Sequence, residues 1–183
     1  MEKDKINILA ISGSLRNSSS NSSIIRQIKT MMPENVNYKI YDGLGNIPPF
    51  DDADAIPAPV TGWRNEIEAA DAVLFCSPEY AFGVPGTLKN ALDWSVGSVA
   101  FSFKPVALIT ASSGGEKAHA ALQLILTALG TKLADSLLIP FVRTKLNDRG
   151  ELSDTVTMLA VQSLVTKLIL AITGNNFPLP DEQ

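Results

Sequence analysis

The stretch SGSLRNSSSN, residues 12–21, joins hydroxyl and amide side chains to a single arginine, directly after the apolar run INILAI. A turn that leads into a helix offers unpaired backbone N–H groups and the positive end of a helix dipole, and both favour an anion. Arg16 adds a planar guanidinium that can form charge-assisted hydrogen bonds to phosphate oxygens. The stretch therefore predicts a site for a phosphate monoester. The alternative is that its last serines only cap the helix, which leaves Arg16 unexplained.

The stretch lacks two common nucleotide-binding patterns, G-x-x-x-x-G-K-[ST] and G-x-G-x-x-G. In the first pattern a lysine reaches the phosphates, and in the second three glycines allow a dinucleotide to approach the backbone. Their absence makes ATP and dinucleotides poor candidates for the ligand of this loop.

Two further stretches could contribute to the same site. SPEYAFGVPGTLKN, residues 77–90, combines stiffening prolines and glycines with Tyr80 and Phe82, whose flat apolar rings suit a planar ligand. These rings could instead fill the core or a subunit contact. TASSGG, residues 110–115, consists of small residues that let a ligand approach the backbone closely, or that simply form a turn.

All three stretches follow apolar runs that are typical of buried strands, and helical patterns separate these runs. The expected strands are residues 6–11, 37–41, 71–77, 105–111 and a segment near 135–141, and the expected helices are residues 22–32, 63–70, 86–94, 116–129 and a last helix from about 153. Strands that are apolar on both faces and are joined by helices predict a doubly wound α/β fold, with a five-stranded parallel sheet covered on both faces. The loops after the strands then share one edge, where ligands bind.

The composition fits one domain over residues 1–183, because 45% of the residues are apolar and 19% are charged. A net charge of −4 provides no basic field, so neither nucleic acid nor an anionic membrane surface is an expected partner. The single cysteine cannot form an internal disulfide, and the first apolar run is too short for a secretory signal, so a cytoplasmic location is expected. Residues 155–173 are apolar but are interrupted by Gln162 and Lys167, which predicts a packed helix. The Pro-rich residues 43–60 are expected to form a surface loop, which either is variable or covers a neighbouring subunit or a site.

Two motifs resemble those of a known family. GSLRNSSSN resembles G-S-L-R-x-x-S-x-N, and PEYAFGVPGTLKNALDW is similar to P-E-Y-N-x-x-x-P-G-x-L-K-N-A-[IL]-D-W, both found in the NAD(P)H-dependent FMN reductases. The motifs occur in the same order, about 57 residues apart, and the alternation of elements extends the resemblance over roughly residues 6–170. The family includes bacterial quinone, azo and chromate reductases.

The resemblance implies a flavodoxin-like fold that binds FMN noncovalently. The residues implied to contact FMN are Ser14, Arg16, Ser19, Ser20, Asn21 and Ser22 around the phosphate, Pro78, Glu79, Tyr80, Ala81, Phe82 and Gly83 beside the isoalloxazine, and Ser112, Ser113 and Gly114 in the loop after the fourth strand. NADPH or NADH would reduce the flavin, which would then reduce a small-molecule acceptor such as a quinone, an azo compound, free flavin or a metal oxyanion. This chemistry requires no catalytic side chain and no metal, and the family forms homodimers or homotetramers.

The sequence departs from the family pattern at two places. Ala81 stands where the family has an asparagine, and the loop after the fourth strand is about two residues shorter than S-x-G-x-x-G-G. These departures motivate one alternative, a flavin-binding sensor without turnover. A flavodoxin-like electron carrier is a second alternative, but carriers of that kind have a T-x-T-G-x-T loop, whereas this loop carries Arg16 and no threonine.

Overall fold

The computed structural model describes residues 5–51 and 55–174. Its strands are β1 (Ile6–Ser12), β2 (Val36–Tyr41), β3 (Ala72–Ser77), β4 (Pro105–Ala111) and β5 (Lys132–Ile139). Its helices are α1 (Ser20–Lys29), α2 (Ala58–Ala69), α3 (Gly86–Asp93), α4 (Glu116–Ala128) and α5 (Thr155–Thr173), with short 3-10 helices η1 (Leu44–Asn46) and η2 (Val142–Lys145). The five strands form one sheet in the order β2-β1-β3-β4-β5, and every neighbouring pair is parallel.

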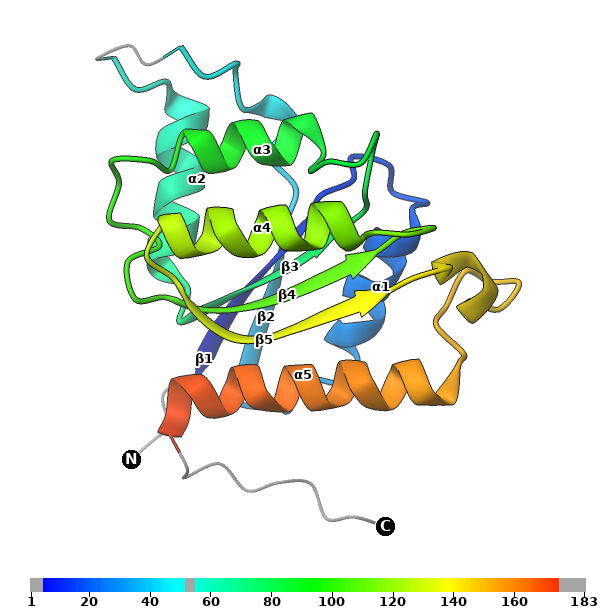
Figure 1. Cartoon of the computed structure of the whole chain (residues 1–183). Coiled ribbons are helices and arrows are strands. Elements are labelled where there is room, and N and C mark those ends of the chain that lie inside the picture. The colour runs from blue at the N-terminus through cyan, green and yellow to red at the C-terminus, as the bar shows by residue number, and fades with distance from the viewer. Residues whose placement is uncertain (1–4, 52–54, 175–183) are drawn as a thin grey trace.

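The sheet separates two hydrophobic cores. Helices α1 and α5 cover one face of the sheet, and α2, α3 and α4 cover the other (Figure 1). In the central strand β3, Leu74 and Cys76 pack on the α1 and α5 side, whereas Val73 and Phe75 pack on the opposite side. Burial on both faces explains why this strand is an uninterrupted apolar run. The predicted doubly wound α/β class with five parallel strands is confirmed.

The sequence predicted the elements well but misplaced several of their ends. Strand β5 begins earlier than expected, because Lys132 pairs with Pro105 at the start of β4. It ends before Pro140, which has no backbone N–H to donate to a sheet. Helix α2 begins five residues before the predicted start at Trp63, and Pro59 occupies its first turn, where a missing N–H costs nothing.

Helix α5 is long and apolar enough to cross a membrane by length and composition alone. One of its faces, however, packs into the core against the sheet through Val161, Leu164 and Leu168, which are fully buried. The prediction of a packed helix is therefore confirmed for this segment.

The Pro-rich segment is more tightly held than the predicted surface loop. Leu44 and Ile47 are buried in the core beside α2 and α3. The backbone oxygen of Pro48 accepts hydrogen bonds from the Asn90 side chain and the Trp94 indole, both at 2.8 Å. The first part of this segment is thus attached to α3, the helix that begins at Gly86, within the candidate stretch of residues 77–90. Residues 52–54 of the segment lie outside the described residues.

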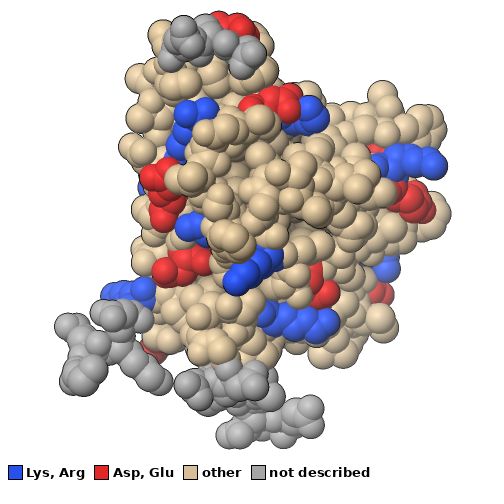
Figure 2. Space-filling view, turned by 60° about the vertical axis from the view of Figure 1, so that its left-hand side comes forward, with Lys and Arg blue, Asp and Glu red and all other residues tan. Residues whose placement is uncertain are grey.

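Acidic and basic side chains lie interspersed on the face shown in Figure 2, and no continuous basic area forms there. Lysine supplies the cation in each of the four ion pairs found among the described residues. The interspersed charges seen in Figure 2 offer no stripe of positive charge for a polyanion on that face.

Candidate functional site

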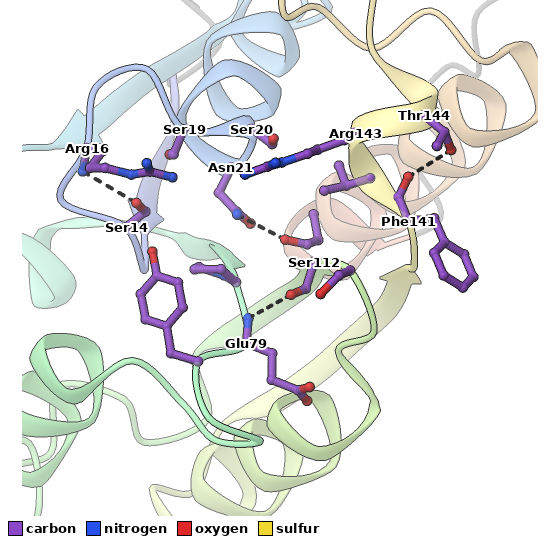
Figure 3. A pocket seen from close by; sticks show the side chains of 15 residues that line it. Ser14, Arg16, Ser19, Ser20, Asn21, Glu79, Ser112, Phe141, Arg143 and Thr144 are labelled. Carbon is purple, nitrogen blue, oxygen red and sulfur yellow. Dashed lines mark hydrogen bonds between the residues drawn. The ribbon is translucent and has the colours of Figure 1, made fainter.

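A cavity of about 480 Å³ opens at the carboxyl edge of the sheet (Figure 3). The chain passes from β1 outward to β2 and then returns to β3 on the other side of β1, so the strand order reverses between β1 and β3. Ligands of open α/β sheets bind at such a switch point. The residues that line the cavity are Ser14, Arg16, Ser19, Ser20, Asn21, Pro78, Glu79, Tyr80, Ala111, Ser112, Ser113, Phe141, Val142, Arg143 and Thr144.

The first loop presents the amino end of α1 to this cavity. Ser19 is the N-cap residue, and its hydroxyl oxygen accepts a hydrogen bond from the Ser22 N–H at 3.1 Å. The backbone N–H groups of Ser20 and Asn21 have no hydrogen-bond partner among the described residues, and both residues line the cavity. A capping role is therefore compatible with an anion site in this loop, because the cap uses one donor and leaves two others without a partner.

Arg16 reaches the same cavity from the loop after β1. Its backbone is held in place by local contacts: its N–H donates to the Ser14 hydroxyl, and its carbonyl accepts from the Ser22 hydroxyl at 3.1 Å. Its guanidinium makes no hydrogen bond or ion pair with the described residues. A fixed backbone with an uncommitted charged side chain is suited to binding an anion.

The Asn21 side chain connects α1 to the sheet. Its amide nitrogen donates to the Ala111 carbonyl at the end of β4, at 3.0 Å, and its Oδ1 accepts from the Cys76 thiol in β3, at 3.2 Å. Only 3% of the Asn21 surface is exposed. The side chain therefore fixes the amino end of α1 against β3 and β4, and this orients the two free N–H groups of the first turn.

The buried position of Cys76 gives a direct chemical prediction. Burial raises the pKa of its thiol well above the ordinary range, and the sulfur is fully enclosed. Because the thiolate is the nucleophile, we expect no measurable reaction of the native protein with a thiol reagent such as Ellman's reagent at mildly alkaline pH. Denaturant should release one reactive thiol per chain. Rapid labelling of the native protein would show that this region of the sheet opens readily.

The loop after β3 forms a tight turn at its tip. Tyr80 and Gly83 exchange two backbone hydrogen bonds, at 3.0 and 2.9 Å, around Ala81 and Phe82. Both central residues have positive φ angles, 49° and 59°, as in the turn type that favours Asn-Gly. Neither side chain is buried, and the Phe82 ring is 83% exposed. The turn is therefore strained at the position where the family pattern has an asparagine.

Replacing Ala81 with asparagine is expected to raise the free energy of unfolding by roughly 0.5–1 kcal/mol, because asparagine tolerates a positive φ better than alanine. Chemical denaturation of the two proteins measures the change. The matched control is Ala81→Val, which should lower stability because a β-branched residue disfavours this conformation. Since Ala81 is exposed, packing contributes little to either substitution. Equal stability of all three proteins would contradict the assigned strain.

Glu79 connects this loop to the loop after β4. Its backbone N–H donates to the Ser112 hydroxyl at 3.3 Å, and its carboxylate accepts from the Ala118 N–H in the first turn of α4 at 2.9 Å. The Glu79 side chain therefore acts within the protein, where a carboxylate stabilises the amino end of a helix. Tyr80, by contrast, is half exposed and lines the cavity beside Pro78.

The structure brings most of the predicted site residues together. Ten of them line the cavity: Ser14, Arg16, Ser19, Ser20, Asn21, Pro78, Glu79, Tyr80, Ser112 and Ser113. Five do not: Ser22, Ala81, Phe82, Gly83 and Gly114. The Ser22 hydroxyl faces the inside of its own loop, where it bonds to Ser19 and to Arg16.

Sequence reasoning missed the wall formed by Phe141, Val142, Arg143 and Thr144. These residues follow β5, and the rule that placed the other three loops at one edge applies equally to this one. The signal was present as an arginine two residues after the end of the expected fifth strand. Only the sheet order, however, places β5 beside β4 and brings this arginine to the cavity.

Comparison with known proteins agrees with this geometry. The family model for NADPH-dependent FMN reductase matches residues 6–141. An NAD(P)H-dependent FMN reductase of Pseudomonas aeruginosa is 39% identical over 116 residues, which are 61% of this chain and 62% of that protein. A quinone reductase of Pseudomonas putida is 37% identical over 58% of this chain and 60% of its own length. The match thus spans about three fifths of these two relatives.

Longer matches have lower identity. A subunit of the NADH:(hydroxy)cinnamate reductase of Vibrio ruber is 29% identical over 90% of this chain and 86% of its own length. Among solved structures, the flavoenzyme NAD(P)H:(acceptor) oxidoreductase FerB of Paracoccus denitrificans superposes with a TM-score of 0.75 and 27% identity. That superposition covers 92% of this chain and 97% of FerB, so the likeness extends over nearly the whole of both chains.

Proposed function

Because the chain belongs to the NADPH-dependent FMN reductase family, we propose that it is a single-domain, FMN-dependent oxidoreductase that uses NADPH or NADH to reduce a small-molecule acceptor. The observation that carries the proposal is the cavity at the switch point. It is lined by Ser20 and Asn21, whose N–H groups have no partner among the described residues, by Arg16, whose guanidinium has none either, and by Tyr80. Bound there, FMN would supply the hydride chemistry that links the nicotinamide to the acceptor.

The residues of the cavity fit this cofactor in size and in chemistry. Its volume of about 480 Å³ lies within the range of small-molecule sites. The phosphate end is provided by Arg16 and by the N–H groups of Ser20 and Asn21. Pro78 and Tyr80 supply apolar surface that would orient the flat ring and exclude water from one of its sides.

The acceptor and the assembly also belong to this proposal. Relatives named as quinone reductases support a quinone as one acceptor, and the Vibrio ruber relative adds hydroxycinnamates as compounds to test. We propose a homodimer or homotetramer, which is supported by the strongly exposed rings of Phe82 and Phe103. A cytoplasmic location is supported by the single, buried and unpaired cysteine.

Two measurements on the purified full-length chain test the function. Flavin released by heating should be FMN, identified by chromatography against FMN, FAD and riboflavin. The FMN-loaded protein should then oxidise NADPH or NADH in the presence of a quinone, with turnover that depends on the quinone. A chain that binds no FMN, or that turns over with neither nicotinamide, would refute the proposal.

The same material separates the two alternatives. Rapid reduction of the bound flavin by a nicotinamide, without a partner reductase, would exclude a one-electron carrier. Tight FMN binding with negligible reduction by either nicotinamide would instead favour a sensor. Rapid mixing with absorbance at the flavin band measures the reduction rate directly.

A further inference from the structure

The turn after β5 forms a rigid wall of the cavity. The N–H groups of Phe141 and Val142 donate to the carbonyls of Ser113 and Ser112, at 3.2 and 3.0 Å, and so join the turn to the loop after β4. Val142 is 95% buried in the core, and Phe141 is held at a φ of 52°, a conformation that a bulky residue adopts only when its surroundings impose it. The next residue, Arg143, therefore begins from a fixed backbone.

The Arg143 side chain extends from this turn towards Ser20 and Asn21, at the amino end of α1, while Arg16 approaches from the loop after β1 (Figure 3). Both arginines line the same cavity. Neither guanidinium forms a hydrogen bond or an ion pair with the described residues. Glu79 also lines the cavity, but its carboxylate accepts a hydrogen bond from the Ala118 N–H in α4 and points away from both arginines (Figure 3).

Two uncommitted guanidiniums in one cavity repel each other unless an anion lies between them. A protein with a net charge of −4 has enough acids to pair both, yet in the described residues it pairs neither. A phosphate monoester carries a charge of about −1.5 to −2 near neutral pH and has three acceptor oxygens, so one arginine neutralises only part of it. The arrangement therefore matches a dianion better than a single carboxylate.

We infer that Arg143 is a second charged contact to the FMN phosphate, opposite Arg16. This inference rests on the proposed function, because it assigns a residue to the phosphate end of that same site. Arg143 holds the phosphate between the turn after β5 and the first turn of α1. Its planar guanidinium can donate two parallel hydrogen bonds to phosphate oxygens.

The test measures binding, not turnover. The flavin is removed from the full-length chain, and FMN and riboflavin are titrated separately while flavin fluorescence is followed. Arg143→Ala should raise the Kd of FMN about 10-fold to 100-fold, the scale of a hydrogen bond to a charged group, and should change the Kd of riboflavin less than about 2-fold. Arg143→Lys, which keeps the charge without the planar guanidinium, should lie between wild type and Arg143→Ala.

The matched control is Arg149→Ala, since Arg149 is also exposed but does not line the cavity. It should leave both dissociation constants unchanged. An unchanged FMN affinity in Arg143→Ala would overturn the inference. If that variant also shows a higher KM for NADPH but not for NADH, Arg143 contacts the nicotinamide cofactor instead. If wild type itself fails to bind FMN, the proposed function fails first.

Discussion

Gly13→Ala is expected to lower the free energy of unfolding by about 1–3 kcal/mol, the usual cost of overpacking a tightly packed site, and to weaken FMN binding at the same time. A Cβ at this position would clash with the Ser77 hydroxyl oxygen and would lie 2.8 Å from the Ser77 Cβ and 3.1 Å from the Ser77 Cα. Ser77 is fully buried, and its hydroxyl donates to the Pro78 carbonyl, so relieving the clash would require this side chain to give up its hydrogen bond or the strand backbone to shift.

The clash would fall beside the cavity, because Ser14 and Pro78, the residues that follow Gly13 and Ser77, both line it. The Gly13 N–H donates to the Cys76 carbonyl at 2.9 Å, which keeps the ends of β1 and β3 together at the switch point. Separating these ends would displace the loop after β1 from the loop after β3. Urea denaturation gives the stability change, and FMN titration gives the affinity change.

Two companion variants make this prediction specific. Gly62→Ala lies on the exposed face of α2, where an added Cβ meets no atom within 4 Å, so it should stabilise the protein by roughly 0.5–1 kcal/mol through helix propensity. Adding Ser77→Gly to Gly13→Ala removes the side chain that clashes and should restore part of the FMN affinity. A Gly13→Ala protein with wild-type stability and affinity would show that the close approach of β1 and β3 is not needed for stability or for FMN binding.

Arg16→Ala is expected to weaken FMN binding by about 1.5–3 kcal/mol, because it removes charge-assisted hydrogen bonds to the phosphate. Riboflavin, which has no phosphate, should bind the variant and wild type equally. The stability of the flavin-free protein should change by less than about 0.5 kcal/mol, because the guanidinium makes no bond to the described residues and Arg16 is exposed.

Fluorescence titration with both flavins measures the effect, and Arg16→Lys is the matched control that retains the charge. The loss for Arg16→Ala should shrink as ionic strength rises, since salt weakens attraction between partly exposed charges. Equal losses for FMN and riboflavin would place Arg16 beside the ring, and an unchanged FMN Kd would remove it from the phosphate site.

Local patterns in the sequence determined the fold class and located the start of the helix after the first strand. Strand β3 is recognisable because both of its faces are buried, which requires an uninterrupted apolar run. The amino end of α1 is recognisable because a turn, a cap and a helix start are formed by neighbouring residues. Both features depend on residues close together in the chain, so composition and spacing were enough to predict them.

Only the tertiary structure decided which groups in those loops remain available to a ligand. Asn21 bonds to Ala111, 90 positions away, and Glu79 bonds to Ala118, 39 positions away, so each side chain has a structural partner that no local pattern reveals. Arg143 reaches the cavity because β5 pairs with β4 and the turn after it is joined to the β4 loop. These outcomes depend on the order of strands in the sheet, and that order is fixed by the packing of distant segments.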